Sequence, residues 1–170
     1  MTYAKRRAIF WTTIGVIGGV IGWALTVSDW RASLPLGIFF ALLVVNTYPS
    51  LQLFSSLVPM SDGKHALADY MLALVYVFLA ASFGNPPQFA LCAVVLFLVA
   101  AGKYSLMVEE VPHPNLIRRK INVDLLGALL CSAVLAAMIF GWEQEAAWTL
   151  AIVFAIANID VLLIRPLYRL

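Results

Sequence analysis

The sequence predicts an all-helical, polytopic membrane protein, a bundle of six transmembrane helices. Hydrophobic residues make up 63% of the 170 residues and charged residues only 12%, whereas soluble domains are about half apolar and about a quarter charged. Six long apolar stretches follow one another, and polar or turn-forming residues separate them. We therefore expect the lipid bilayer to be the solvent of the chain, with residues 1–170 forming one transmembrane domain.

The expected spans follow from length, because a helix needs about 20 apolar residues to cross the hydrocarbon core. They are residues 8–28, 34–57, 66–84, 88–107, 121–141 and 146–164. The first follows a basic segment as a signal peptide would, but its length and the lack of a small-residue cleavage site favour a retained helix. The third and fourth spans are the shortest, so four spans with one re-entrant hairpin are the alternative.

The basic residues predict the orientation, because Lys and Arg stay on the cytoplasmic side of a membrane. With a cytoplasmic N-terminus, all of the 11 Lys and Arg residues except Arg31 fall on that side. Trp23, Trp30 and Trp142 then lie near the outer boundary, as an aromatic belt requires. We expect a multi-pass protein of the cell's inner membrane, with both termini in the cytoplasm.

An internal repeat is a further interpretation of the layout. Residues 69–107 align with residues 124–162 without a gap, so that Asp69 falls on Asp124 and Lys103 on Asn158. A basic residue precedes the acid in both segments, which suggests three helical-hairpin repeats. The alternative is that the positive-inside rule produces this pattern in every hairpin.

Five polar side chains interrupt the later spans, at positions where charge is costly and often marks function. They are Asp69, Lys103, Asp124, Asn158 and Asp160. One interpretation is a polar cluster at the cytoplasmic mouth of a pathway, where carboxylates bind a cation or relay protons. The other is structural: Asp69 and Lys103 neutralise each other, and Asp124 bonds to Asn158 or to a nearby basic residue.

The second span contains Asn46, Pro49 and Ser50. Proline has no amide hydrogen, so Pro49 frees the carbonyl near Val45. With Asn46 and Ser50, this carbonyl forms a candidate broken-helix element that could hold a small cation or water. The alternative is a simple proline kink whose carbonyl is satisfied locally.

The first span carries Gly15, Gly18, Gly19 and Gly22, two interleaved GxxxG pairs that permit close helix packing. Their partner is another helix of the same bundle or a second subunit. The small residues of the fifth span, which include Gly127, are the candidate partner within the bundle.

Several classes of function lack support in the sequence. No catalytic motif of hydrolases, metalloproteases or nucleotide-binding loops occurs. His65 and His113 lie at a span edge and in a loop, which excludes haem ligation by paired mid-membrane histidines. We therefore expect no metal site and no cofactor. The net charge of +2 is small, so nucleic acid is not an expected partner.

Three hypotheses for function remain. The first is a small transport or channel-type protein, or a subunit of one, that uses the cytoplasmic-side polar cluster. The alternative is a non-transporting accessory, assembly or immunity subunit. Its expected partner is a larger membrane protein, or further copies of the chain in a homo-oligomer. A weaker alternative is an intramembrane lipid-modifying enzyme that uses Asp69 and Asp124. The residues do not identify the ligand.

Overall fold

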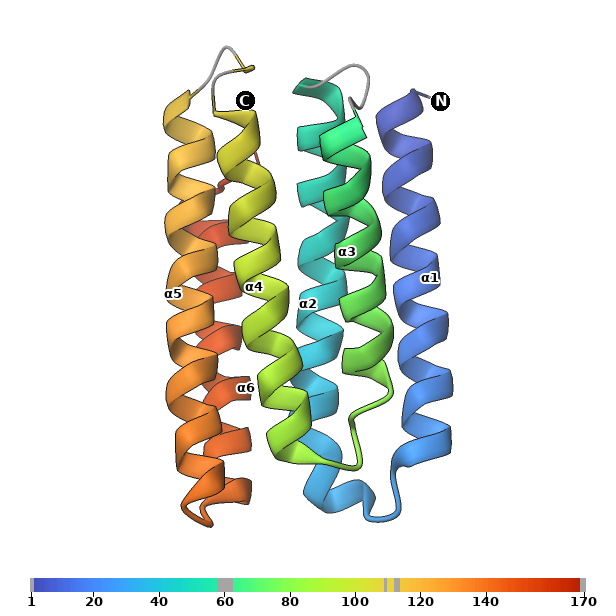
Figure 1. The fold of residues 1–170 in the computed structure, drawn as a ribbon, viewed down its shortest axis with the longest axis vertical. Coiled ribbons are helices and arrows are strands. Elements are labelled where there is room, and N and C mark those ends of the chain that lie inside the picture. The colour runs from blue at the N-terminus through green and yellow to red at the C-terminus, as the bar shows by residue number, and fades with distance from the viewer. Residues whose placement is uncertain (1, 58–62, 109, 112–113, 169–170) are drawn as a thin grey trace.

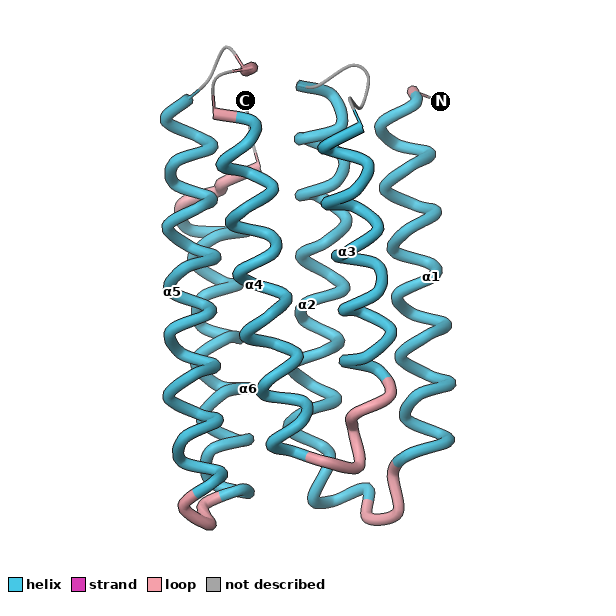
Figure 2. Tube along the Cα trace, viewed as in Figure 1, coloured by secondary structure: helices cyan, strands magenta, loops and turns pink. Residues whose placement is uncertain are grey.

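A computed structural model describes residues 2–57, 63–108, 110–111 and 114–168. Within these residues all regular secondary structure is helical, as Figure 2 shows, which confirms the predicted fold class. The helices are α1 (Tyr3–Thr26), α2 (Trp30–Leu57), α3 (Gly63–Ala80), α4 (Pro86–Met107), α5 (Pro114–Ile139) and α6 (Glu143–Ile159). A π-helical turn, η1 (Asp160–Ile164), continues α6.

Five of these helices are long and apolar enough to cross a membrane, if α6 is counted together with η1. The third helix is shorter, with an apolar stretch of Leu67–Ala80. It ends at Ala80 rather than at residue 84, because Ala81–Gly84 form a turn before Asn85 caps α4. The bundle therefore fits a multi-pass integral membrane protein.

The helices run alternately up and down (Figure 1). One end of the bundle holds the start of α1, and Arg7, Lys103 and Lys120 lie toward it; we call it the basic end. The opposite end holds the short turns after α1, α3 and α5. Helices that follow one another in the chain therefore run antiparallel.

Local sequence explains the turns at the opposite end. The Asp29 carboxylate accepts hydrogen bonds from the amides of Arg31 and Ala32 at the start of α2. Asn85 does the same for the amide of Gln88, at 3.1 Å, with a proline next to it in the first helical turn. Gly141 supplies the positive φ of 91° that the turn into α6 requires.

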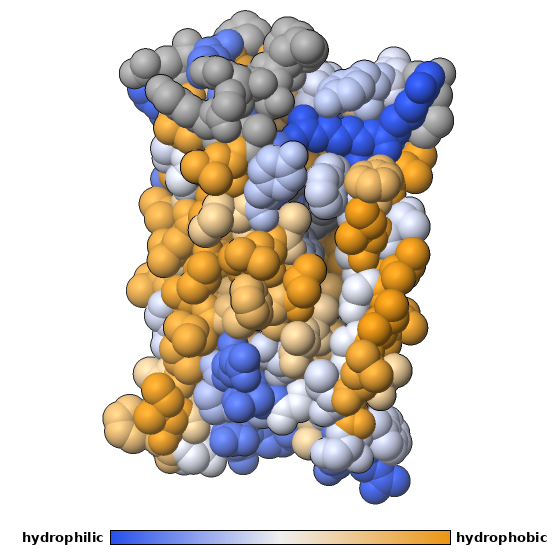
Figure 3. Space-filling model, turned by 45° about the vertical axis from the view of Figure 1, so that its right-hand side comes forward, coloured by the Kyte–Doolittle hydropathy of each residue, from blue (hydrophilic) through white to orange (hydrophobic). Residues whose placement is uncertain are grey.

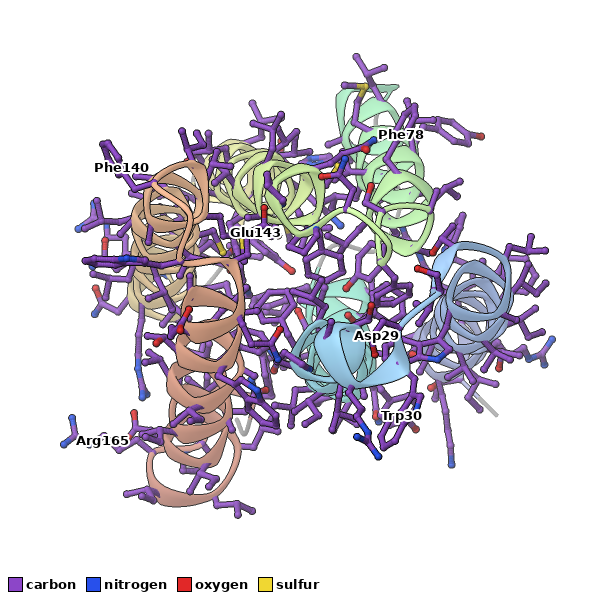
Figure 4. All side chains as sticks on the ribbon, turned by 90° about the horizontal axis from the view of Figure 1, so that it is seen from below. Asp29, Trp30, Phe78, Phe140, Glu143 and Arg165 are labelled. Carbon is purple, nitrogen blue, oxygen red and sulfur yellow. The ribbon has the colours of Figure 1, made fainter. Side chains whose placement is uncertain are left out.

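An aromatic core joins the middle of the bundle. Phe39 of α2 is completely buried, and its ring lies 5.8 Å from Phe89, 6.5 Å from Phe97 and 4.5 Å from Phe154. These residues belong to α4 and α6, so α2 lies at the centre of the bundle. Figure 4 shows this arrangement along the bundle axis, with α1 at one edge, α5 and α6 at the other, and Phe140 pointing outward.

The first helix lies at the periphery and packs through its small residues. Its buried residues are Ala4, Ala8, Gly19 and Gly22. A Cβ at Gly19 would lie 2.4 Å from the Phe40 ring of α2, and a Cβ at Gly22 would lie 2.1 Å from the Ala80 carbonyl oxygen of α3. The glycine partners are therefore α2 and α3.

The expectation that the fifth span meets these glycines is wrong. A Cβ at Gly127 of α5 would instead meet the ring of Phe97 of α4, at 2.9 Å. In Figure 4, α2, α3 and α4 lie between α5 at one edge of the bundle and α1 at the other. Gly19 faces the bulky Phe40 ring, and Gly22 faces the backbone of Ala80. Small residues allow this kind of close approach as well as packing against another small-residue face.

The outer surface is apolar around the middle of the bundle. Figure 3 shows hydrophobic atoms there, with hydrophilic atoms gathered toward the two ends. Large exposed side chains on this surface include Val20, Leu126, Leu129 and Ile156, which are all more than half exposed. An apolar band between two polar ends is what a bilayer requires of a helical bundle.

Candidate functional site

A cavity of about 460 Å³ lies within the bundle, between α1, α2, α3 and α4. Its volume falls in the range of small-molecule sites, roughly 300–1,000 Å³. Most of its wall is apolar, including Leu43 and Val44 of α2, Ala73 of α3, and Leu96 and Ala100 of α4. The polar residues of the wall are concentrated toward the basic end: Thr12, Asn46, Thr47, Ser50, Asp69, Lys103, Tyr104, Lys120 and Asp124.

The cavity reaches the outer surface between α1 and α3, on the side that Figure 3 brings forward. Ile14 of α1 lines it, as do Tyr70, Leu74 and Val77 of α3, and all four are substantially exposed. Gly18 also lines it, and nothing lies within 4 Å of where its Cβ would be. We call this gap the α1–α3 opening. It faces the region that lipid would occupy.

Two contacts between α1 and α3 bound this opening. Toward the opposite end, Gly22 approaches the backbone of Ala80 so closely that no side chain fits between them. Toward the basic end, Arg7 forms an ion pair with Asp69. The separation along α1 from Arg7 to Gly22 is about 22 Å at 1.5 Å per residue, so the opening spans much of the bilayer core.

Asp69 connects three helices. One carboxylate oxygen accepts from Arg7 of α1, and the other accepts from the Lys103 ammonium of α4 at 2.5 Å. The Asp69 and Lys103 side chains are only 16% and 8% exposed. Asp69 itself belongs to α3, so this ion-pair network ties α1, α3 and α4 together beside the cavity.

A second, smaller pocket of about 30 Å³ lies next to the network, on the side of the basic end. Asp69 and Lys103 line both pockets, and Arg7, Phe54 and His65 line the smaller one. His65 is buried and bonds to the Glu110 carboxylate at 2.8 Å. The Arg7–Asp69–Lys103 network therefore separates the cavity from the basic end.

Asp124 is paired differently, within its own helix. One of its oxygens accepts from Lys120, one turn earlier in α5, and both side chains are buried. The Lys120 ammonium lies 5.0 Å from the centre of the Tyr104 ring, and the Tyr104 hydroxyl bonds to Ser50 at 3.0 Å. A buried polar cluster thus joins α2, α4 and α5.

The end of the chain closes this cluster. After η1, the Leu167 amide donates to the Val161 carbonyl, and Leu167 is fully buried. The Tyr168 ring packs edge-on against Phe54 at 6.2 Å. Burial raises the pKa of the Tyr168 phenol, so this hydroxyl stays protonated and able to donate at neutral pH.

Three buried polar atoms on the cavity wall have no hydrogen-bond partner among the described residues. They are Thr12 Oγ1, Asn46 Oδ1 and Asp124 Oδ2. The asparagine and aspartate oxygens can only accept hydrogen bonds, and a buried acceptor without a donor costs about 1–3 kcal/mol. Residues at the polar end of the cavity therefore carry acceptors that no described residue engages.

The candidate broken-helix element lies in a continuous helix, since α2 runs through Pro49. Asn46 and Ser50 both line the cavity. The Thr47 hydroxyl donates to the Leu43 carbonyl at 2.8 Å and lies 2.5 Å from the Tyr76 hydroxyl. The proline removes one amide hydrogen from α2 without interrupting the helix.

The remaining predicted residues divide between the cavity and other places. Gly15 and Gly18 line the cavity, whereas Gly19 and Gly22 pack against neighbouring helices. The Asn158 amide donates to the Phe154 carbonyl within α6. Asp160 is exposed, and it lies 3.6 Å from the Arg165 guanidinium. These last two residues are not among those that line the cavity.

Sequence reasoning missed the contacts of Arg7, Tyr104 and Tyr168. It allowed a nearby basic residue as a partner of Asp124, and in the structure this residue is Lys120. The spacing of Lys120 and Asp124, one helical turn, was a signal for their pairing. The contact of Arg7 with Asp69 connects residues 62 positions apart, and no local pattern predicts it.

The described residues contain no group of three or more His, Cys, Asp and Glu side chains that could hold a metal ion. Comparison with known proteins adds no assignment: no family model, curated protein or solved structure matches this chain. The function must therefore be argued from the cavity and its polar end.

Proposed function

We propose that this protein is a small transport-type membrane protein that binds a membrane-dissolved small molecule in the cavity and passes it toward the basic end. The observation that carries the proposal is the apolar cavity, which opens between α1 and α3 and ends at two buried ion pairs. Mostly apolar pockets with a few convergent polar groups are the usual form of small-molecule sites.

The two carboxylates argue against a free metal cation as the cargo. Asp69 is held by two cations, Arg7 and Lys103, and Asp124 is held by Lys120. Three positive charges against two negative charges leave this region with a net charge of +1, which repels cations. The apolar wall, in contrast, favours the hydrocarbon part of a ligand.

The Arg7–Asp69–Lys103 network lies at a position that suits a gate. It separates the cavity from the small pocket at the basic end, and it consists of side chains that can exchange partners. A molecule that entered from lipid would have to displace these contacts to leave at the basic end. The charge distribution supports a cytoplasmic basic end in the inner membrane.

Reconstitution into liposomes tests the proposal. A fluorescent single-chain lipid analogue is placed in both leaflets, and a membrane-impermeant reductant then destroys the fluorescence of the outer leaflet. We expect the inner pool to become accessible faster with the protein than in protein-free vesicles. Gly18→Leu should return the rate to that of protein-free vesicles, because it fills the α1–α3 opening.

Gly102→Leu is the matched control. A Cβ at Gly102 also meets nothing within 4 Å, but Gly102 does not line the cavity. This variant should transport like the wild type. Equal rates with and without wild-type protein would overturn the proposal. Stable co-purification with a larger membrane protein would then favour the accessory-subunit alternative.

A further inference from the structure

We infer that the ligand is a neutral, single-chain amphipath whose head group donates hydrogen bonds, such as a long-chain alcohol or a monoacylglycerol. This inference rests on the proposed function and adds the chemistry of the ligand. It depends on three features of the cavity: the shape of its apolar part, the buried atoms at its polar end, and the charge around them.

The apolar part of the cavity extends along the helix axes. Lining residues of α3 run from Asp69 to Ala80, about 17 Å along the helix axis at 1.5 Å per residue. The wall along this length consists mainly of aliphatic side chains and Phe40 and Phe97. A single hydrocarbon chain that lies parallel to the helices fits this space and can enter sideways through the α1–α3 opening.

The polar end selects a donor. Asn46 Oδ1 and Asp124 Oδ2 are buried acceptors without a partner among the described residues, and both residues line the cavity. Asp124 is 1% exposed. The Thr12 hydroxyl, also buried on this wall, can donate or accept. A hydroxyl head can donate to any one of these three oxygens.

Anionic and cationic head groups fit this polar end less well than a neutral donor. The net positive charge of this region attracts a carboxylate or a phosphate diester, but such a head has no donor and would place its own oxygens against Asn46 Oδ1 and Asp124 Oδ2. An ammonium head would enter a region where Arg7, Lys103 and Lys120 already outnumber the two carboxylates. The neutral donor avoids both penalties, so the head group sets specificity while the chain supplies most of the apolar contact.

Competition photolabelling tests this inference with the intact protein in lipid nanodiscs. A hexadecanol that carries a diazirine in its chain is the probe, and unlabelled hexadecanol, palmitic acid and hexadecylamine compete. We expect hexadecanol to displace the probe at a concentration about tenfold below that of the acid and the amine, the value of one hydrogen bond in a buried site.

Two variants separate the head-group contact from folding. Thr12→Val keeps the shape of the side chain and removes the hydroxyl, so the preference for hexadecanol should fall severalfold. Thr12→Ser retains the hydroxyl and should retain the preference.

The outcomes distinguish the two proposals. Saturable labelling with equal competition by all three heads would overturn the head-group inference and leave the proposed function standing. Tighter competition by the acid or by the amine would overturn it in favour of a charged ligand. The lack of any saturable labelling would contradict the proposed function itself.

Discussion

Asp69 and Asp124 occupy aligned positions in the sequence, yet the fold uses them in opposite ways. The Asp69 carboxylate forms ion pairs with basic side chains of two other helices and so holds α1, α3 and α4 together. Asp124 takes its cation from its own helix and leaves one oxygen unpartnered among the described residues. Both oxygens of Asp69 are thus engaged in ion pairs that link helices, whereas one oxygen of Asp124 is not engaged by any described residue.

The difference shows that a buried charge in a membrane helix is informative only together with its partners. A carboxylate satisfied by two helices stabilises their arrangement, and its removal leaves two cations uncompensated. A carboxylate whose cation belongs to its own helix does not by itself join two helices. Neutralising each acid in turn therefore measures how much each ion pair contributes to the stability of the protein and to ligand binding.

The largest effect is expected from Asp69→Ala. This change leaves Arg7 and Lys103 facing each other without the carboxylate, and breaking a buried pair costs roughly 3–5 kcal/mol. The free energy of unfolding, measured by denaturant titration in detergent micelles, should fall by that amount. Arg7→Met, which leaves the Asp69–Lys103 pair in place, should cost clearly less. Equal losses in the two variants would contradict a three-helix role for Asp69.

The next largest effect is expected from Gly22→Leu, at the other contact between α1 and α3. The new side chain meets the Ala80 carbonyl, whose oxygen lies 2.1 Å from the Cβ position, and overpacking costs about 1–3 kcal/mol. The same measurement on Gly18→Leu should show a change of about 0.5 kcal/mol or less, because that position is open. A destabilised Gly18→Leu variant would show that the α1–α3 opening is closed.

A smaller loss of stability is expected from Asp124→Asn. The amide keeps the shape of the side chain, and its oxygen can still accept a hydrogen bond from Lys120, so the charge is lost but the contact is not. The Tyr104 ring also still faces the Lys120 ammonium at 5.0 Å. We expect a loss of about 1–2 kcal/mol in the free energy of unfolding, together with weaker binding of the alcohol probe. A loss of stability as large as that of Asp69→Ala would remove the contrast between the two acids.

Asp160→Asn should have the smallest effect. Its carboxylate lies 3.6 Å from the Arg165 guanidinium, and both side chains are exposed. Exposed pairs contribute about 0–1 kcal/mol, so stability and probe binding should both stay near the wild-type values. A marked loss of binding would place Asp160 on the pathway after all.

The fold could be predicted from the sequence because lipid requires every backbone polar group to be hydrogen-bonded within the protein. Long apolar stretches bounded by polar turns form helices in a bilayer. The caps at Asp29 and Asn85 start α2 and α4 at Trp30 and Pro86, before the expected span starts at residues 34 and 88. The third helix was overestimated at its end, since the apolar residues of Ala81–Gly84 form a turn. Composition alone does not distinguish an apolar turn from a helix end.

The site was predicted in part. Asp69, Lys103, Asp124, Asn46 and Ser50 were all selected as polar residues in apolar spans, and they all line the cavity. The cavity itself has no sequence signal, because it depends on how far α1 stands from α3. The partners of the acids depend on tertiary contacts, and the insertion of Tyr168 depends on the course of the chain after η1.

The most direct test of the account is to locate a bound chain by photolabelling and peptide mass spectrometry. The diazirine hexadecanol should label the lining segments of α1, α3 and α4 saturably in the wild type and in Gly102→Leu. Gly18→Leu should lose this labelling while still carrying the nonsaturable labels of its lipid-facing surface. Labelling that is nonsaturable and identical in all three proteins would contradict a binding site in this cavity.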